Sequence, residues 1–255
     1  MTTATAATTA VHDFAAAVRE RLEALEAFAA DGGLDASVDL IERAIRAGGV
    51  AYAFGTGHSE AFAMEIAGRA GGLIPSKKIS LRDLSLTGGM PVADLQGGKL
   101  ERDPGVADRL FALAAVGPHD VVLIASNSGV NGSIVGFALA AKANGNPVIA
   151  VTSMDHTARV EPKHPSGQRL RDVADIAIDN LAPYGDAAIT VGAVVPVGAV
   201  SSITAAFIAQ LLTVGVAERF VAAGEPAPLY LSANIPGGDE HNTELEARYG
   251  IDRSA

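Results

Sequence analysis

The chain has 255 residues, 49% of them hydrophobic and 19% charged, which is enough to bury the core of one large α/β domain and excludes wholesale disorder. Its formal net charge of −10 argues against a general binder of nucleic acids or anionic membranes, so neither is expected as a partner. The absence of cysteine excludes disulfides and thiolate chemistry, and it is compatible with the cytoplasmic location that we expect.

The first 47 residues predict a helical arm. The opening MTTATAATTAVHDF has no basic segment followed by an apolar run, so it does not resemble a signal peptide, and residues 1–9 are expected to fray. Apolar residues recur at helical spacing from about 11 to 30, where two glycines stop the helix. Residues 36–47 predict a second amphipathic helix. Together the two predict a helical hairpin that leads into the main domain.

Strands and helices then alternate along the chain. Strands are predicted at 50–54, 77–81, 121–125, 147–152 and 175–179. Helices are predicted from the first turn to about 70, and at 105–115, 131–144 and about 197–223. This alternation predicts an α/β fold, a doubly wound parallel sheet with helices on both faces, in a three-layer arrangement of the flavodoxin type. We expect this domain to span 48–224, with a tail over 225–255 that completes the site or an interface.

Three further segments need a separate interpretation. Residues 82–104 contain two Gly-Gly pairs and two prolines and predict a loop-rich lid, and 161–172 predict an exposed loop. No charged residue occurs from Ala187 to Ala217. A membrane span is one reading of this run, but its proline, glycines and hydroxyl residues favour a buried helix, which could also lie at a subunit interface.

Two turns rich in small polar residues follow predicted strands. Both lie at the carboxyl edge of the sheet, where parallel sheets bind ligands. Helix amino termini and glycine backbone favour an anion there, while hydroxyl and amide groups add donors without charge. The alternative is that these residues only cap helices. The candidate binding residues are Gly55, Thr56, Gly57 and Ser59 in the first turn and Ser126, Asn127, Ser128, Gly129, Asn131 and Ser133 in the second, with Thr152 and Ser153 after the next strand.

Common nucleotide motifs do not match these turns. The segment GTGHSE has Glu60 where a dinucleotide fingerprint needs its third glycine, and no G-x-x-x-x-G-K-[ST] motif is present. A phosphate on a small molecule is therefore the favoured ligand, and no cofactor is expected.

The combination of GTGHS with SNSGVNGSIVGFALAAKANGNPVIAVTS resembles the sugar isomerase (SIS) domain. Known SIS proteins include phosphoheptose isomerases, the isomerase half of glucosamine-6-phosphate synthase and N-acetylmuramic acid 6-phosphate etherases. The chain also resembles one branch of SIS proteins in the segments RAGGL, DNLAPYGDA and NIPGGDEHN. This narrower resemblance does not imply a particular reaction. The resemblance implies that serines of the two turns bind the phosphate of a sugar. It also implies a homodimer or tetramer with sites near subunit interfaces.

Four residues are candidates for the chemistry. Glu65 lies in an otherwise apolar helical segment, where it is either a general base or the partner of Arg69. His58 lies within the first turn. His241 and Glu240 lie in the glycine-rich tail, where an exposed acidic helix start is the alternative.

The sequence departs from the family pattern at one position. Phosphoheptose isomerases and the etherases carry a catalytic glutamate about ten residues after the serine of the first turn, where this chain has Arg69. Four weaker candidates follow the last predicted strand, namely Asp179, Asn180, Tyr184 and Asp186. No metal is expected, because His156, Glu161 and His164 match no standard spacing.

Three functions remain open from the sequence. The leading hypothesis is an aldose–ketose isomerase that acts on a sugar phosphate by carboxylate-mediated proton transfer. A sugar-phosphate lyase of the etherase kind would share the proton abstraction. A non-catalytic phosphosugar sensor is the third, although the amino-terminal segment is Ala/Glu-rich rather than basic as a DNA-binding helix pair would be.

Overall fold

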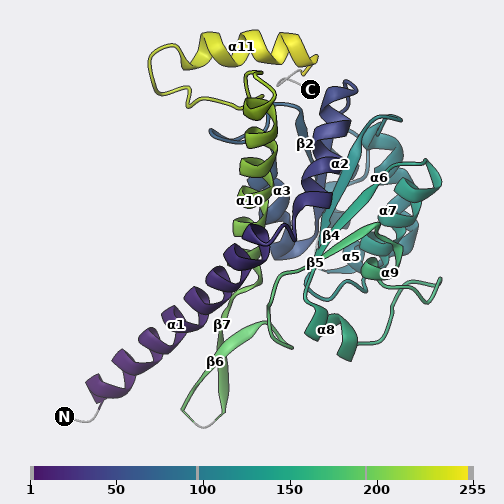
Figure 1. The fold of residues 1–255 in the computed structure, drawn as a ribbon. Coiled ribbons are helices and arrows are strands. Elements are labelled where there is room, and N and C mark those ends of the chain that lie inside the picture. The colour runs from purple at the N-terminus through teal and green to yellow at the C-terminus, as the bar shows by residue number, and fades with distance from the viewer. Residues whose placement is uncertain (1–2, 96–97, 193, 252–255) are drawn as a thin grey trace.

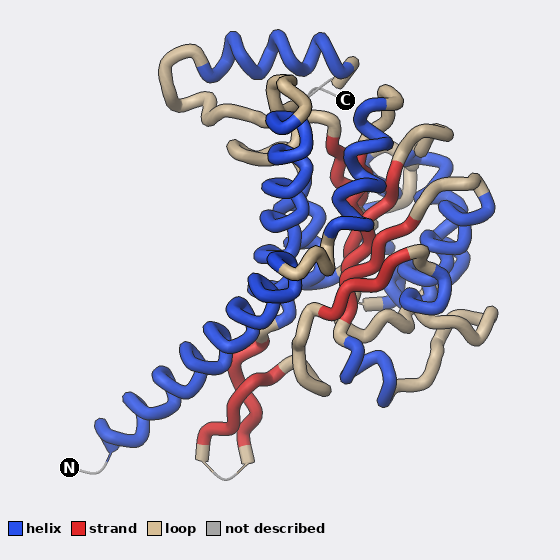
Figure 2. Tube along the Cα trace, in the orientation of Figure 1, coloured by secondary structure: helices blue, strands red, loops and turns tan. Residues whose placement is uncertain are grey.

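The computed structural model describes residues 3–95, 98–192 and 194–251. Its centre is a parallel sheet in the order β2-β1-β3-β4-β5, as Figures 1 and 2 show. The strands are β1 (Ala51–Gly55), β2 (Ser76–Ile79), β3 (Val121–Ala125), β4 (Val148–Thr152) and β5 (Ile176–Asp179). This is the flavodoxin-type doubly wound order, whose direction of winding reverses between β1 and β3. The predicted fold class is confirmed.

Burial explains why these five segments form strands. Every residue of β1, β3 and β4 is buried, which is typical of parallel strands covered on both faces. In the register of β1 and β3, Gly55 lies opposite Ala125. The two glycine- and serine-rich turns that follow these strands therefore begin side by side at one edge of the sheet.

Helices cover the two faces of the sheet (Figure 1). One face packs against α2 (Asp35–Arg46), α3 (Glu60–Ile66) and α10 (Ser201–Ala222), whose apolar residues form one core cluster with the sheet. The other packs against α6 (Ala107–Ala114), α7 (Gly132–Ala143) and the single turn α9 (Leu170–Val173) in a second core cluster. The carboxyl edge of the sheet is fixed between these two layers.

The amino-terminal helix α1 (Thr3–Ala30) is longer than expected, because its described part begins at Thr3. The helix includes residues 3–9, residues 1–2 lie outside the described residues, and the expected fraying of 1–9 stays a prediction. In Figure 1, α2 continues away from the end of α1 rather than folding back along it.

The sequence reading missed a hairpin between β5 and α10. Strands β6 (Ala187–Val191) and β7 (Val195–Ala199) pair antiparallel and extend beside α1 (Figure 1). The prediction that the helix begins near 197 is wrong, since α10 begins at Ser201. Pro196 and Gly198 obscured the second strand, because both residue types are rare within strands. Gly198 is required by packing, since a Cβ there would lie 2.5 Å from the Phe14 ring.

Short helices occupy the segments predicted as loops. The predicted lid holds α4 (Asp83–Leu86), η2 (Val92–Leu95) and α5 (Lys99–Arg102), followed by η3 (Pro104–Val106). A further helix, α8 (Met154–Arg159), follows β4, and the tail contains α11 (Gly238–Tyr249). The helices of three to six residues among these lack a periodic pattern long enough to read from sequence.

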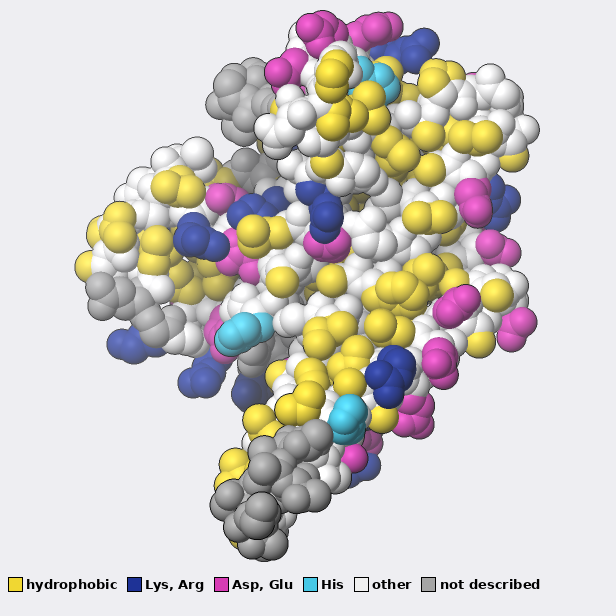
Figure 3. Space-filling model, turned by 90° about the vertical axis from the view of Figure 1, so that its left-hand side faces the viewer, with side chains coloured by type: hydrophobic (Ala, Val, Ile, Leu, Met, Phe, Trp, Pro, Cys, Tyr) yellow, Lys and Arg dark blue, Asp and Glu magenta, His cyan; other side chains and the backbone are white. Residues whose placement is uncertain are grey.

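Helix α10 alone, among the described residues, is long and apolar enough to cross a membrane, although 39% of its apolar window is buried within the molecule. Ala205, Ile208, Leu212 and Val216 on its inner face belong to the core cluster with the sheet, so α10 is a core helix of this fold. Figure 3 shows hydrophobic side chains on the side of the molecule where α10 lies. Val214 and Val221 are among its exposed apolar residues.

Candidate functional site

The two predicted turns meet at the carboxyl edge of the sheet. The first turn folds tightly onto the end of β1, since a Cβ added to Gly55 would lie 2.2 Å from the Ser59 carbonyl oxygen. Gly57 and Gly129 have φ of +58° and +64°, in the left-handed region that favours glycine. Three glycines are therefore needed to give the two turns their shape.

A small cavity of about 10 Å³ lies between the turns, room for about one water molecule. Within it, the Ser126 hydroxyl accepts the Gly129 N–H at 3.2 Å, and Asn127 Oδ1 accepts from the Asn180 amide at 3.2 Å. The lining residues are His58, Ser59, Phe62, Ala125, Ser126, Asn127, Val151, Asn180, Ser201, Ser202 and Ala205. The structure therefore brings His58, Ser59, Ser126 and Asn127 together, as the sequence led us to expect.

Several predicted binding hydroxyls have protein partners. Ser133 donates to the Glu101 carbonyl at 2.7 Å, Ser153 to the Ala182 carbonyl at 2.5 Å, and Thr152 to the Asn127 carbonyl at 3.3 Å. All three residues are fully buried. In this conformation their hydroxyls hold the edge of the sheet together rather than facing a cavity.

Asn131, at the start of α7, behaves differently. Its Oδ1 atom is buried and has no hydrogen-bond partner among the described residues. A buried amide oxygen without a partner is costly, and a bound ligand or water would satisfy it. Ser128, half-buried beside it, completes the polar part of the second turn.

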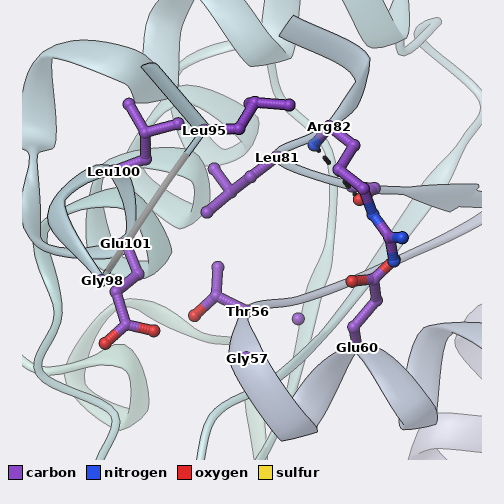
Figure 4. Close-up of a pocket in the computed structure, with 11 residues that line it drawn as sticks. Thr56, Gly57, Glu60, Leu81, Arg82, Leu95, Gly98, Leu100 and Glu101 are labelled. Carbon is purple, nitrogen blue, oxygen red and sulfur yellow. Dashed lines mark hydrogen bonds and ion pairs between the residues drawn. The ribbon is translucent and has the colours of Figure 1, made fainter. Parts of the chain in front are cut away.

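A larger cavity of about 310 Å³ opens on the other side of the first turn (Figure 4). Thr56 and Gly57 form one wall, and three leucines from the predicted lid and its edge form the opposite wall. Carboxylates lie toward both ends. The lining residues are Gly55, Thr56, Gly57, Glu60, Ser80, Leu81, Arg82, Leu95, Gly98, Leu100 and Glu101. The size suits a small ligand with a few placed polar groups.

Glu60 closes one end of the larger cavity in an ion-pair cluster. Its Oε1 accepts from Arg82 at 2.7 Å and from Lys78 at 3.2 Å. Burial alone would raise the pKa of Glu60, but the hydrogen bonds from Arg82 and Lys78 outweigh it and hold that pKa below its ordinary value. Glu60 is therefore a carboxylate fixed in its charged form, which makes it a poor proton acceptor.

Glu101 lies toward the other end of the larger cavity, on α5. A Cβ built on Gly57 would be 3.5 Å from Glu101 Oε2, so the carboxylate lies beside the first turn. Among the described residues, no cation forms an ion pair with it. Sequence reasoning missed Glu101, because only the fold of the segment 82–104 brings it to the edge of β1.

Glu65 lies away from both cavities. It pairs with Arg69, and its Oε1 also accepts from the Gln210 amide at 2.7 Å. Gln210 is five residues along α10 from Ala205, which lines the small cavity, so the contact lies about 7.5 Å farther along the helix axis at a rise of 1.5 Å per residue. Helix α3 ends at Ile66 rather than near residue 70. The predicted alternative, an ion pair with Arg69, is the arrangement observed.

His241 and Glu240 are not brought to this edge within one subunit. Both lie in the first turn of α11, where Glu240 is exposed and His241 Nε2 contacts the Leu229 carbonyl at 3.0 Å. Leu229 in turn pairs with Leu73, just before β2. The tail therefore packs near the amino ends of the strands, opposite the two turns.

Of the weaker candidates, Asn180 lines the small cavity, whereas Asp186 lies beyond β5. Asp186 accepts the N–H of Ser201 at 2.8 Å and so caps α10. His156 Nδ1 accepts the N–H of Gly185 at 3.1 Å, whereas His164 Nδ1 contacts Ser166. The described residues contain no group of three or more His, Asp or Glu side chains placed to hold a metal ion.

Comparison with known proteins identifies the family of this chain. The SIS domain family model matches residues 13–153, more than half of the chain. The chain belongs to the SIS domain family. Two relatives support a narrower grouping, since the UPF0309 protein of Listeria monocytogenes is 35% identical over 91% of this chain and 93% of its own. The UPF0309 protein BH3325 of Halalkalibacterium halodurans is 36% identical over 82% of this chain and 86% of its own.

Solved SIS structures share the fold at lower identity. A phosphoheptose isomerase from Francisella tularensis superposes with a TM-score of 0.54 at 16% identity, covering 85% of this chain and 98% of its own. An Escherichia coli CFT073 protein solved in complex with a sugar phosphate gives a TM-score of 0.52 at 17% identity, covering 86% and 93%. At this identity the likeness concerns the fold alone.

Proposed function

We propose that this SIS protein is an aldose–ketose isomerase that acts on a sugar phosphate. The observation that carries the proposal is the larger cavity beside the first turn, between the carboxyl ends of β1 and β2. It places Glu101, a carboxylate without an ion pair among the described residues, beside the first glycine turn. Similarity to a phosphoheptose isomerase and to a protein solved with a sugar phosphate supports the choice of ligand.

In this proposal the sugar occupies the larger cavity and its phosphate binds where the two turns meet. Backbone N–H groups at the start of α7, together with Ser59, Ser126 and Ser128, supply donors for the phosphate. The space between the turns holds only about one water as it stands. A phosphate therefore binds there only if the turns move apart, and we expect slower amide hydrogen exchange at 126–131 once it is bound.

The proton transfer is assigned to Glu101. A carboxylate takes the proton from the carbon next to the carbonyl and returns it to the former carbonyl carbon, while a hydroxyl proton moves between the two oxygens. Glu60 is less suited, because hydrogen bonds from Arg82 and Lys78 lower its pKa and so make it a weaker base. Glu65 is held by Arg69 and Gln210 outside the cavity.

The test is proton exchange in D₂O with a panel of aldose and ketose phosphates, followed by NMR. We expect interconversion with deuterium at the carbon next to the carbonyl, and a loss of about 10²–10⁴-fold in Glu101→Gln. Asp94→Asn, an exposed residue of the same segment that does not line the cavity, is the matched control. Deuterium exchange accompanied by elimination of a substituent from the sugar phosphate would identify a lyase instead of an isomerase. Tight binding with no exchange would support a sensor and overturn the proposal.

A homo-oligomer is part of the same proposal. Uncharged strands β6 and β7 expose Val191, Val195 and Val197 beside the amino-terminal helix. A two-stranded hairpin is marginal in water on its own, and edge strands usually carry charges that prevent pairing. We propose that a second copy covers this hairpin. The cytoplasmic location and the division at residues 47 and 224 stay predictions.

A further inference from the structure

The segment that carries Glu101 lies directly on the start of α7. The hydroxyl of Ser133, a fully buried residue, donates to the Glu101 carbonyl at 2.7 Å. One residue earlier, a Cβ added to Gly132 would lie 2.4 Å from the Arg102 carbonyl oxygen, so there is no room for even a methyl group. Closely packed groups transmit displacement. The backbone of 101–104 therefore follows any movement of the first turn of α7.

That first turn of α7 also adjoins the phosphate site of the proposed function. Asn131, immediately before α7, has a buried Oδ1 without a hydrogen-bond partner among the described residues. The space between the glycine- and serine-rich turns holds about one water, so a phosphate enters only if these turns move apart. Because α7 begins where the second turn ends, this movement displaces the start of α7 as well.

The Glu101 side chain extends from this backbone toward the other turn. Its Oε2 lies 3.5 Å from the position of a Cβ built on Gly57, and Figure 4 shows the carboxylate at the end of the larger cavity away from Glu60. Among the described residues, no ion pair holds this carboxylate. Its position therefore depends on the backbone of α5, which Ser133 holds.

We propose that phosphate binding between the two turns sets the position of Glu101 for proton transfer, and that Ser133 is the positioning residue that transmits the movement. This inference rests on the proposed function and adds to it a use for the phosphate. The binding energy of a group remote from the reacting carbon then raises kcat instead of only lowering KM. A sugar without its phosphate meets a misplaced base, and a displacement of about 1 Å reduces the rate about 10²-fold.

The first experiment follows amide hydrogen exchange as inorganic phosphate is added, with chloride at the same ionic strength as the reference. In the parent protein, exchange should slow at 126–131 and also at 99–103. In Ser133→Ala it should slow at 126–131 alone. Ser76→Ala is the matched control and should behave as the parent. Ser76 is also a buried serine that donates to a backbone carbonyl, but it lines neither cavity.

The second experiment uses the sugar phosphate found in the D₂O assay and its unphosphorylated form. Ser133→Ala should lower kcat for the sugar phosphate about 10–100-fold, with KM within about twofold. Inorganic phosphite, which replaces the missing phosphate, should raise turnover of the unphosphorylated sugar about tenfold or more in the parent and in Ser76→Ala. In Ser133→Ala this activation should be lost. A lower stability of the variant does not produce that loss, because the comparison is made within one folded protein.

The outcomes separate the inference from the proposed function. If phosphate slows exchange at 126–131 but not at 99–103 in the parent, the inference is overturned while the phosphate site stands. The same holds if Ser133→Ala keeps the slowing at 99–103 or the activation by phosphite. If phosphate slows neither segment, the proposed phosphate site is wrong and the inference fails with it. If both segments slow but no sugar phosphate is isomerised, the proposed reaction is wrong, and Glu101 has no proton transfer for which to be positioned.

Discussion

Replacement of Glu65 by glutamine separates a structural role from a catalytic one. The side chain of Glu65 is 21% exposed and that of its partner Arg69 is 48% exposed. An exposed pair of this kind contributes about 0.2–1 kcal/mol. Glutamine can still accept the hydrogen bond from Gln210, although a neutral acceptor binds more weakly than a carboxylate. The expected loss is about 1 kcal/mol, or about 2–4 °C in Tm for a chain of this size.

The assay combines thermal unfolding with isomerase kinetics. Glu65→Gln should lower Tm by this amount and leave kcat within about twofold, since Glu65 lines neither cavity. Arg69→Ala should give a similar loss. The double variant should then lose less than the sum, because both changes remove the same ion pair. A hundredfold or larger fall in kcat at unchanged Tm would refute the reasoning and make Glu65 the base.

Three other outcomes are expected. Gly55→Ala places a Cβ 2.2 Å from the Ser59 carbonyl oxygen, so urea unfolding should show a loss of about 1–3 kcal/mol; a variant as stable as the parent would contradict this. Burial lowers the pKa of His156 below its ordinary 6.5, against the opposing charges of two nearby aspartates. As the pH falls, His156 is protonated in the unfolded chain before it is protonated in the folded protein. Its contribution to the free energy of unfolding is therefore fully present above about pH 6.5 and is lost as the pH falls below that value. His156→Gln should reduce the loss of stability as the pH falls below about 6.5, and an unchanged slope would exclude this cause. Val197→Asp in the exposed hairpin should reduce the mass measured by light scattering to that of one chain, with circular dichroism unchanged; an unchanged mass would show that the hairpin is not the interface.

Hydrophobic runs were enough to predict the three central strands of the sheet. β1, β3 and β4 are wholly buried, and parallel strands covered on both faces need a nearly continuous apolar run. The two turns could also be predicted from the sequence, because Gly57 and Gly129 have positive φ, a backbone conformation that favours glycine. The hairpin at 187–199 could not be predicted from the sequence. Its strands hold Pro196 and Gly198, and their pairing depends on contact with a helix about 180 residues earlier.

The candidate site divides in the same way. The sequence by itself determined the α/β sheet, the two glycine- and serine-rich turns and the absence of thiol chemistry, since each depends on residues close together in the chain. Only the tertiary structure decided which carboxylate faces the cavity. The sequence pointed to Glu65 and not to Glu101, but Glu65 is bonded to Gln210 of α10, whereas the fold of 82–104 brings Glu101 to the edge of β1. Which carboxylate faces the cavity depends on side-chain partners that are far apart in the sequence, and no local sequence pattern predicts those partners.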